Sequence, residues 1–358
     1  MSKPCSPTPS GTVMTTDRDQ EDTMTDTRRV RVVVDAVGGD MAPEEILAGV
    51  QRAVSRNVEA EVLLTGPAEI VTDFARRHER VTAHPTTEII AMDEHPAQAV
   101  RSKKDSSIVA GCRLVKDGHA EAFFSAGSTG ACMAAATLVM GRIKGVSRPA
   151  IATVVPTAGR PAVLLDVGAN ADCKPGNLLQ FAFMGAAYAQ TVLGVTRPRI
   201  ALLNIGEEPT KGSALAIEAH RLMGDTLPGF VGNIEGRDIL AGEIDVIVTD
   251  GFTGNIALKL LEGTSRVLLG QVKDVMTATP AHTLAAALFR SGFRGLRERL
   301  DPDTYGGAPL LGVNGVCIIG HGSSGARAVD AAIGVAATAV RGELPGCIAN
   351  AVTASPET

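Results

Sequence analysis

The feature of this sequence that most restricts its fold is a repeated pattern in which an aliphatic run ends in a small or polar residue and then a glycine. It occurs six times, at residues 30–40, 122–130, 163–170, 200–207, 246–255 and 316–322. A helix-like stretch follows most of these runs, and that alternation is typical of a mostly parallel sheet covered by helices. We therefore predict an α/β fold.

The loops after these runs carry Asp, Asn, Glu and His side chains. In an open parallel sheet, ligands bind in the crevice beyond the carboxyl ends of the strands. We therefore expect the six loops to converge on one rim and to form a functional site there. A purely structural fold would need short turns at these places, but not polar side chains at such regular positions.

The loop after the second run is the strongest candidate for binding an anion. It connects a short apolar run to an almost uncharged helix-like stretch. A helix N-terminus offers unpaired backbone N–H groups, and glycines allow the close approach of an oxyanion. The alternative is that a hydroxyl only caps the helix and that the glycines only shape the turn. The residues predicted to bind phosphate here are Ser125, Gly127, Ser128, Thr129 and Gly130.

Three lysines are further candidates for holding phosphate. Lys103 stands beside Lys104 just before a predicted helix, and Lys174 and Lys211 lie in loops after later strands. Lysine pairs before a helix can hold phosphate, although a solvated surface pair is an equally good interpretation.

Composition narrows the class of protein. The chain has 358 residues, which is room for one large α/β domain or two modest ones. Its net charge of −5 argues against nucleic acid as a partner. The six cysteines form no Cys-x-x-Cys pair, which favours a reducing, cytoplasmic location. No spacing of Cys or His indicates a metal site, and we predict no cofactor.

The chain divides into a body and two tails. Residues 1–28 are polar and are expected to be a disordered tail, residues 29–343 a single α/β domain, and residues 344–358 a C-terminal tail. Within the domain, a helical segment at about 256–300 is expected to protrude. The longest apolar helical run is about half of the ~20 residues that a membrane span needs.

The end of that segment is predicted to be an amphipathic helix. At helical spacing, Phe289 and Phe293 share a narrow apolar stripe, and Arg290, Arg294 and Arg297 lie beside it. Such a helix suits a membrane surface or an acidic protein. The alternative is an ordinary helix packed on its own core, which Gly292 and Gly295 favour because glycine weakens a free-standing helix.

The loop at 320–325 has the pattern G-x-G-x-x-G and follows a predicted strand. A dinucleotide site also needs a later strand that ends in an acidic residue, and too little chain remains for one. We interpret the loop as a phosphate-binding or packing turn. His321 is a candidate donor there, although a single loop histidine is more often structural.

In sequence and order, eight motifs resemble those of the bacterial acyl carrier protein:phosphate acyltransferases, the PlsX family. They are DAVGGD (35–40), SAGSTGA (125–131), DVGAN (166–170), NIGEE (204–208), GNIEG (232–236), DGFTGN (250–255), YGGAPLLG (305–312) and GHGSS (320–324). The resemblance extends from about Val30 to Arg341. Val37 stands where the family usually has Met, and the N-terminal tail is an extension that the family does not require.

The resemblance implies a fold and an activity. It implies a three-layer α/β/α fold similar to those of phosphotransacetylases and isocitrate dehydrogenases, and a homodimer. The implied reaction moves a fatty acyl group from acyl carrier protein to inorganic phosphate and gives an acyl phosphate for phospholipid synthesis. Loose contact with the inner face of the cell membrane, and with a downstream glycerol-phosphate acyltransferase, follows from the same resemblance.

Phosphate is itself the nucleophile in such a reaction, so no Ser or Cys nucleophile is needed. We therefore look for oxyanion donors, for a proton donor to the thiolate and for a residue that holds them. The candidates are Asn204, Asn255 and His321, with Asp250 as the residue that holds one of them. Two other functions stay open. One is a short-chain phosphate acyltransferase that uses coenzyme A, and the other is a non-catalytic scaffold at the membrane surface.

Overall fold

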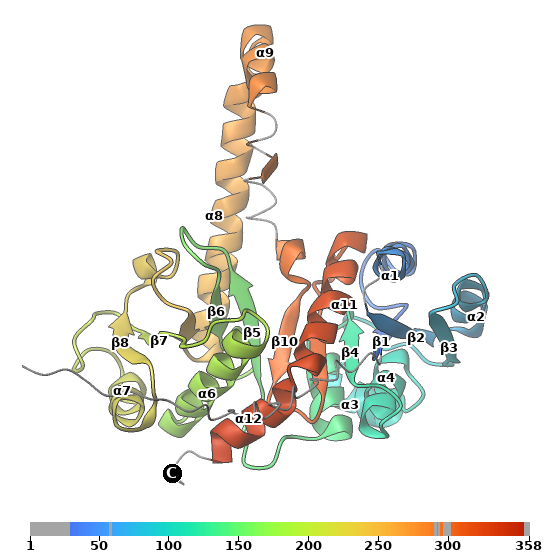
Figure 1. The fold of residues 1–358 in the computed structure, drawn as a ribbon, viewed down its shortest axis with the longest axis horizontal. Helices are drawn as coiled ribbons and strands as arrows, with labels where there is room; N and C mark the ends of the chain where they lie inside the picture. Colours follow the sequence, from blue (N-terminus) through green and yellow to red (C-terminus); the bar gives the residue numbers. More distant parts are fainter. Residues whose placement is uncertain (1–28, 57–58, 290–291, 293, 296–301, 354–358) are drawn as a thin grey trace, which may run out of the picture.

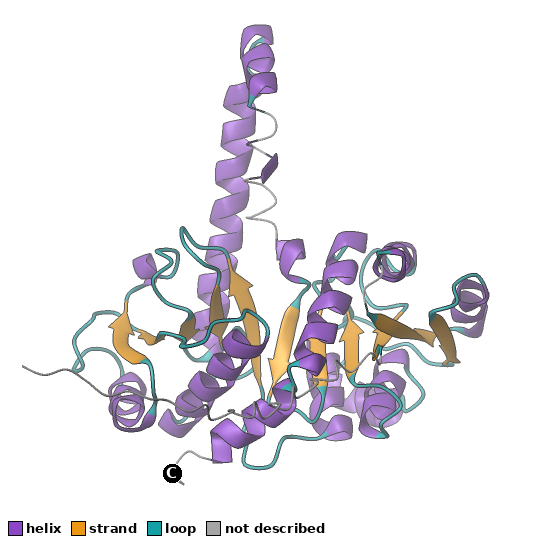
Figure 2. Cartoon of the chain, in the orientation of Figure 1, coloured by secondary structure: helices purple, strands orange, loops and turns teal. Residues whose placement is uncertain are grey.

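The computed structural model describes residues 29–56, 59–289, 292, 294, 295 and 302–353, and strands alternate with helices along most of this length (Figures 1 and 2). The strands are β1 (Val30–Asp35), β2 (Ala60–Gly66), β3 (Val81–Pro85), β4 (Ala122–Ser125), β5 (Ala150–Val155), β6 (Ala162–Leu165), β7 (Ile200–Leu203), β8 (Phe230–Ile234), β9 (Val246–Val248), β10 (Ala308–Leu311) and β11 (Val316–Ile319). The α-helices are α1 (Glu44–Ser55), α2 (Ala68–Arg76), α3 (Pro96–Ser102), α4 (Ser107–Lys116), α5 (Thr129–Ala135), α6 (Pro175–Thr191), α7 (Ala214–Thr226), α8 (Gly251–Thr277), α9 (Pro280–Leu288), α11 (Ala326–Arg341) and α12 (Leu344–Thr353). A π-helical turn (Ala136–Met140) extends α5, and 3₁₀ turns lie at Gly236–Asp238 and Pro302–Tyr305.

The described strands form one 11-stranded sheet in the order β3-β2-β1-β4-β11-β10-β5-β6-β9-β7-β8. Most neighbouring strands are parallel, which confirms the predicted sheet. The antiparallel pairs are β11–β10, β10–β5 and β5–β6, and they stand in a row in the middle of the sheet. The last of these pairs is a hairpin, as the two apolar runs at 150–156 and 162–166, joined by a turn that contains Gly159, predict.

Strand direction changes across the middle of the sheet. Each antiparallel pair reverses the direction, so three in a row leave β6, β9, β7 and β8 running opposite to β1, β4 and β11. The loops after β1, β4 and β11 therefore leave the sheet at one end of the strands, and those after β6, β7 and β9 leave it at the opposite end. We call these two ends of the strands the two edges of the sheet. The prediction of a single rim is wrong, because the pattern of strand ends does not reveal which strands pair antiparallel.

Helices cover both faces, as a three-layer α/β/α fold requires. Successive strand side chains point to opposite faces. In β1, Val32 and Val34 pack in one core with α1, α2, α6, α7, α11 and α12, and Val33 packs in a second core with α3, α4 and α5. In β4, Phe124 belongs to the first core and Phe123 to the second. The two cores hold the loops of the sheet edges in fixed positions.

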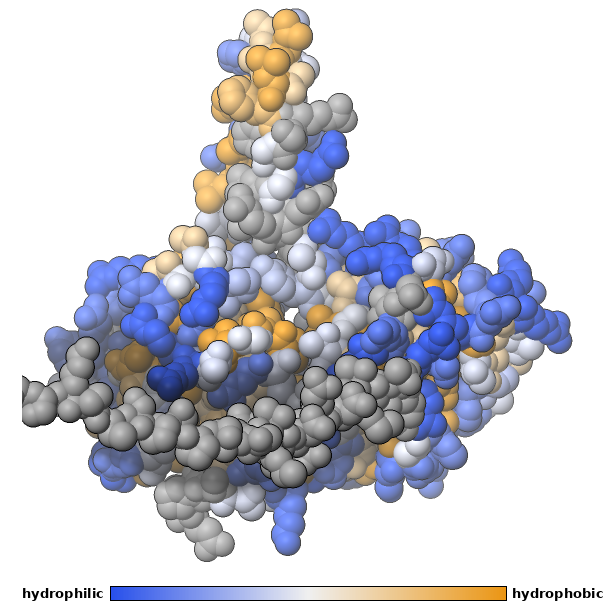
Figure 3. Space-filling view, viewed as in Figure 1, coloured by the Kyte–Doolittle hydropathy of each residue, from blue (hydrophilic) through white to orange (hydrophobic). Residues whose placement is uncertain are grey.

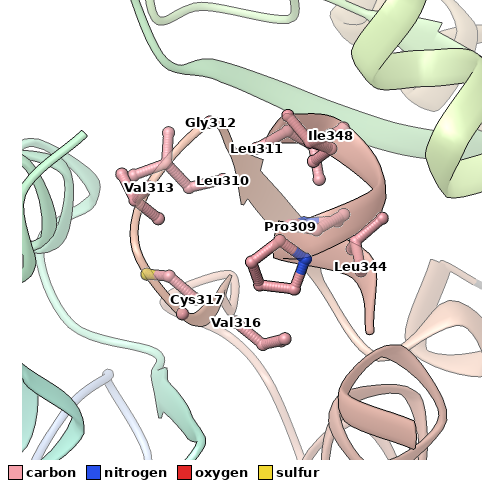
Figure 4. Close-up of a pocket in the computed structure, with 11 residues that line it drawn as sticks. Pro309, Leu310, Leu311, Gly312, Val313, Val316, Cys317, Leu344 and Ile348 are labelled. Atoms are coloured by element: carbon pink, nitrogen blue, oxygen red, sulfur yellow. The ribbon is translucent and has the colours of Figure 1, made fainter. Parts of the chain in front are cut away.

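The C-terminus corrects one sequence prediction. Residues 344–353 form α12 rather than a tail, because Leu344, Ile348 and Val352 are buried against the body. In Figure 4, Leu344 and Ile348 of α12 lie beside Pro309 and Leu311 of β10. The cavity between them measures only about 10 Å³, so this is a packed contact with room for about one water.

Helices α8 and α9 leave the body as a projection (Figure 1). Apolar side chains are exposed along it, among them Leu260 and Val275 on α8 and Leu284 and Leu288 on α9. Figure 3 shows that apolar surface gathers at the tip of the projection. Within the described residues, no helix has the length and apolar content that crossing a bilayer requires.

Candidate functional site

The loops after β1, β4 and β11 pack against one another at one edge of the sheet, and we call them the first loop group (residues 35–40, 125–130 and 320–325). The backbone N–H of Gly320 donates to the carbonyl oxygen of Ser125 at 2.8 Å. The N–H of Asp40 donates to the carbonyl oxygen of Gly322 at 2.7 Å. Neighbouring strands position all three loops, because β1 pairs with β4 and β4 with β11.

A buried hydrogen bond fixes the base of this group. The Ser125 hydroxyl donates to Oδ2 of Asp35 at 2.7 Å, and both side chains are almost completely buried. Burial raises the pKa of Asp35 above its ordinary value, against the opposing effect of hydrogen bonds from Ser125, Ser107 and the N–H of Val37. The Ser125 hydroxyl also accepts from the N–H of Gly127 at 3.0 Å. Ser125 therefore shapes the loop from inside, and its side chain does not face a ligand as the sequence analysis expected.

Glycine at position 38 lets the loops approach this closely. A Cβ at Gly38 would lie 2.6 Å from Oδ2 of Asp35 and 2.7 Å from the N atom of Gly127. Atoms cannot approach a Cβ so closely without displacement, so a side chain here would push the first two loops apart. The glycine pattern of the sequence thus reflects backbone packing at this edge.

Helix α5 starts in the first loop group. Ser128 is the N-cap of α5, and its hydroxyl accepts from the N–H of Ala131 at 3.4 Å. The N–H groups of Thr129 and Gly130 lie in the first turn, where a helix provides no backbone acceptor. Such groups, with the positive end of the helix dipole, bind anions.

Two more predicted residues, His321 in the third loop and Lys103 outside the group, differ in their contacts. His321 is exposed, and its Nδ1 lies 2.8 Å from the hydroxyl of Ser323. Lys103 is instead paired with the carboxylate of Glu94 at 2.6 Å and donates to the carbonyl oxygen of Ile89 at 2.7 Å. The ammonium of Lys103 is thus already neutralised by a neighbour on its own segment.

The loop after β6 and the start of α8 pack together at the opposite edge, and we call them the second loop group (residues 166–170 and 250–255). Asp166 is buried, and its carboxylate accepts from the N–H groups of Ala169 and Asn170 at 2.9 and 2.8 Å. Burial raises the pKa of Asp166, and these hydrogen bonds oppose that rise. The N–H of Gly251 donates to the carbonyl oxygen of Asn170 at 2.8 Å.

Asp250 caps α8 and does not hold another candidate residue, which corrects the role that the sequence analysis gave it. Its Oδ1 accepts from the N–H groups of Phe252 and Thr253 at 3.0 and 2.9 Å, and its Oδ2 accepts from the Thr253 hydroxyl at 2.8 Å. The first N–H groups of α8 are therefore occupied. This N-terminus has no free donors for an anion, unlike that of α5.

The remaining predicted residues lie on the side of β6, β7 and β9. Asn255 is exposed on the first turn of α8, and a Cβ at Gly168 would be 3.7 Å from its Oδ1. Asn204 supports its own loop, because its Nδ2 donates to the carbonyl oxygen of Lys211 at 2.9 Å. Lys211 and Lys174 are exposed, and Lys174 is the N-cap residue of α6. These residues therefore follow strands that end at the edge opposite to the first loop group.

The predicted partner surface is only partly described. Phe289 ends α9 and is exposed, and Arg294 is exposed as well. Arg290, Arg297 and Phe293 lie outside the described residues.

Other catalytic chemistries find little support in the described part of the chain. It contains no cluster of three or more His, Cys, Asp or Glu side chains that could hold a metal ion. Burial raises the pKa of the Cys132 thiol to about 12, and that of Cys317 is raised by the same cause. These thiols stay protonated near neutral pH and are poor nucleophiles.

Sequence reasoning missed the two buried aspartates. Asp35 is the last residue of β1 and Asp166 directly follows β6, and each organises a glycine loop through hydrogen bonds to its backbone. The signal was present, because both stand two or three positions before a glycine. The sequence alone could not show that their carboxylates turn inward.

Known proteins resemble this chain over nearly its whole length. Residues 30–345 match a family model described as "Fatty acid synthesis protein". A phosphate acyltransferase from Desulfitobacterium hafniense is 50% identical over 311 residues, which are 86% of this chain and 93% of that protein. A phosphate acyltransferase from Heliobacterium modesticaldum is 49% identical over 317 residues, or 87% and 94% of the two chains.

Solved structures with the same fold are more distant in sequence. A phosphotransacetylase from Streptococcus pyogenes superposes with a TM-score of 0.58 at 19% identity and covers 87% of this chain and 94% of its own. A branched-chain phosphotransacylase from Enterococcus faecalis has a TM-score of 0.55 at 15% identity and covers 86% and 98%. These likenesses confirm the fold that the sequence motifs imply.

Proposed function

We propose an acyl donor and a phosphate site for this chain. The chain belongs to the fatty acid synthesis protein family and is a phosphate acyltransferase. The donor is a fatty acyl group carried as a thioester on acyl carrier protein, and the product is an acyl phosphate for phospholipid synthesis. The family description and the eight sequence motifs support this donor.

Phosphate binds in the first loop group, at the N-terminus of α5. The observation that carries this proposal is the contrast between two helix starts. Asp250 and Asn170 occupy the first N–H groups of α8, whereas those of Thr129 and Gly130 in α5 have no acceptor in their own helix. The other two loops of the group pack against residues 125–127, just before this helix start, and a phosphate dianion at the helix start meets N–H donors and the helix dipole.

The reaction then needs no nucleophile from the protein. An oxygen of phosphate forms a bond with the thioester carbonyl carbon, the carbon–sulfur bond breaks, and the thiolate takes up a proton. Holding phosphate in line with the thioester supplies proximity, and N–H donors at the developing oxyanion lower the barrier. His321, exposed on the third loop of the group, is the proposed proton donor to the thiolate.

The second loop group has a supporting part in this proposal. Asn255 is exposed beside Gly168 and is available to contact the acyl donor. Asp250 and Asn204 shape their own loops, because their side chains are hydrogen-bonded to the backbone of these loops. Lys174 and Lys211 are exposed cations that suit the acidic groups of a carrier protein.

Release of free thiol from an acyl thioester, followed against phosphate concentration, tests both parts of the proposal. Acyl carrier protein thioesters should react faster than the matching coenzyme A thioesters. A strict requirement for coenzyme A would overturn the proposed donor and favour the short-chain alternative. Absence of phosphate-dependent release would overturn the activity itself.

A pair of variants tests the phosphate site. A Cβ at Gly130 would lie 2.6 Å from Cγ of Pro96, so Gly130→Ala should disturb the start of α5 and raise the KM for phosphate about tenfold or more. Asn255→Ala in the second loop group should leave that KM unchanged. The reverse pattern would move the phosphate site to the opposite edge.

We also propose that the α8–α9 projection carries the contacts with a second copy of the chain and with the membrane surface. Exposed Leu284, Leu288 and Phe289 near its tip, with Arg294 exposed nearby, support an apolar contact flanked by cations. A downstream glycerol-phosphate acyltransferase would meet the acyl phosphate at that surface.

A further inference from the structure

A pocket of about 520 Å³ lies away from both loop groups, between the end of α1, the end of α6 and one side of α11. Its volume is in the range of pockets that bind small molecules. The residues that carry the argument are Arg52, Arg56, Tyr188, Asp330 and Gly334. None of them belongs to the predicted or proposed phosphate site.

A buried carboxylate with one unused oxygen stands at the wall of this pocket. Asp330 is only 3% exposed. Its Oδ2 lies 2.6 Å from Nη1 of Arg56 and 3.7 Å from Nε of Arg52. Its Oδ1 is buried and has no hydrogen-bond partner among the described residues. A buried polar atom without a partner is costly, so the carboxylate of Asp330 has capacity for a further donor.

The pocket carries an excess of positive charge. Arg52 and Arg56 line it, and Asp330 is the carboxylate among its lining residues. The guanidinium groups of Arg52 and Arg56 are more than half exposed, so they keep donors for a further anion while they pair with Asp330. Arginine is well suited to phosphate, because its planar group presents several donors at once.

The rest of the lining combines aliphatic side chains with the hydroxyl-bearing side chains of Tyr188, Thr304, Tyr305 and Thr338. Val192, Leu193 and Val335 supply aliphatic wall, and Figure 3 shows apolar surface in the recess between the two halves of this face. Tyr188 is almost completely buried, and burial raises the pKa of its phenol, which therefore stays protonated and able to donate. A ligand that fills this pocket meets cations, one carboxylate oxygen and hydrocarbon.

We propose that this pocket binds a phosphate monoester that carries a hydroxyl group near its phosphate. The phosphate pairs with Arg52 and Arg56, the hydroxyl donates to the carboxylate of Asp330, and the carbon chain lies on the aliphatic wall. The same chemistry occurs in a free polyol phosphate and in a lysolipid whose polar end is such a phosphate. The site goes beyond the proposed acyl transfer and does not depend on it.

Calorimetric titration of the full chain, with no acyl donor present, tests the site with a matched pair of ligands. Glycerol 3-phosphate and propyl phosphate differ in their hydroxyl groups. We expect glycerol 3-phosphate to bind about tenfold more tightly or better, because a hydrogen bond to a buried charged group is strong. Equal binding of the two ligands would overturn the role of Asp330, and binding of neither would overturn the site.

A 1-octanoyl ester of glycerol 3-phosphate distinguishes the two sources of this chemistry. Tighter binding of the ester than of the free phosphate supports a lysolipid, since the acyl chain then gains from the aliphatic wall. Equal or weaker binding supports a free polyol phosphate.

Gly334→Leu tests the location without removing any native contact. Gly334 lines the pocket, and a Cβ there meets no heavy atom within 4 Å, so the new side chain occupies the pocket itself. We expect it to weaken binding of glycerol 3-phosphate at least about tenfold. Gly224→Leu on α7 is the matched control, because a Cβ at Gly224 also meets open space. Unchanged affinity in Gly334→Leu would place any binding elsewhere and overturn the proposal.

Two further variants, Arg56→Gln and Tyr188→Phe, test the proposed contacts with the ligand, and Arg341→Gln is the control for the loss of an arginine. Arg56→Gln should weaken both propyl phosphate and glycerol 3-phosphate, whereas Arg341→Gln, on the same helix as Asp330 but paired with Glu59, should change neither. Tyr188→Phe keeps the size of the side chain and should weaken glycerol 3-phosphate several-fold. Affinities equal to wild type in both Arg56→Gln and Tyr188→Phe would contradict the proposed contacts.

Discussion

The hydroxyl of Ser125 donates to Oδ2 of Asp35 at 2.7 Å, and this contact joins the last residues of two neighbouring parallel strands. Each partner also holds the loop that follows it, because Asp35 accepts from the N–H of Val37 and Ser125 accepts from the N–H of Gly127. The starts of two glycine loops are therefore fixed by one buried pair. The shape of the proposed phosphate site depends on it.

Ser125→Ala should destabilise the protein by about 1.5–3 kcal/mol, because it removes a donor from a buried carboxyl group. Urea unfolding measures this loss. Ser102→Ala is the control, since the Ser102 hydroxyl makes only exposed or partly buried bonds within α3 and its loss should change the free energy of unfolding by less than about 0.5 kcal/mol. Equal losses in the two variants would show that the Ser125–Asp35 bond contributes little.

The stability of the protein should depend on pH through Asp35. Burial raises the pKa of Asp35 above its ordinary value of 3.8, so the folded protein holds this proton more tightly than the unfolded chain. Its contribution to the free energy of unfolding is present below the unfolded pKa and is lost as pH rises through the folded pKa. Asp35→Asn cannot ionise. Its stability relative to wild type should therefore rise as the pH increases from the unfolded pKa of 3.8 through the raised folded pKa, by about 1.4 kcal/mol for each pKa unit of the shift.

Urea unfolding of both proteins at several pH values checks this dependence. Asp105→Asn is a control of opposite sign, because hydrogen bonds from Thr87 lower the pKa of Asp105. The stabilising effect of the Asp105 carboxylate is present above its unfolded pKa and is lost as pH falls. A difference between Asp35→Asn and wild type that stays constant with pH would contradict the raised pKa.

Much of the fold could be predicted because it depends on local patterns. The runs that end at Asp35, Ser125 and Leu165 are β1, β4 and β6. Their apolar periodicity and their glycines are properties of a few adjacent residues. Such properties can be read from one sequence.

The arrangement of the site could not be predicted, because it depends on long-range pairing. The sequence indicates the hairpin of β5 and β6, but it does not show that β10 pairs with both β11 and β5. That additional strand decides that Ser125 and Asp166 lie at opposite edges of the sheet. The inward turn of the Asp250 carboxylate onto its own helix is likewise a matter of side-chain geometry.

Gly38→Ala should disrupt the first loop group. Its Cβ would lie 2.6–2.7 Å from Asp35 Oδ2, the N atom of Gly127 and the Ser125 hydroxyl, none of which is the end of a flexible chain. We expect the KM for phosphate to rise at least about tenfold. Gly224→Ala, in open space on α7, should keep the wild-type KM and be stabilised by up to about 1 kcal/mol. A Gly38→Ala protein with normal kinetics would exclude this group as the phosphate site.

Asp250 should be replaceable by another capping residue. Asp250→Asn keeps an oxygen that accepts from the N–H groups of Phe252 and Thr253, so turnover should stay near that of wild type. Asp250→Ala removes the cap and should cost about 1–2 kcal/mol of stability. Thermal unfolding and steady-state kinetics on the same preparations distinguish the roles. A large loss of turnover in a normally stable Asp250→Asn protein would indicate acid–base chemistry instead.

The tip of the projection should be the part that binds membranes. Leu288 is 83% exposed and Leu284 is 75% exposed, and burying such side chains in lipid contributes roughly 1.5–3 kcal/mol each. Glutamate at both positions should therefore weaken sedimentation with anionic lipid vesicles by at least about tenfold. Thr283→Glu adds one negative charge, half of that in the double variant, on the same helix at an already polar position and should weaken binding far less. Thiol release from a dissolved acyl thioester should be unaffected by either change, because the tip is remote from the first loop group (Figure 1). If the double variant bound vesicles as tightly as wild type does, the apolar tip would serve a protein contact instead. The oligomeric states of the double variant and wild type in solution would then be compared.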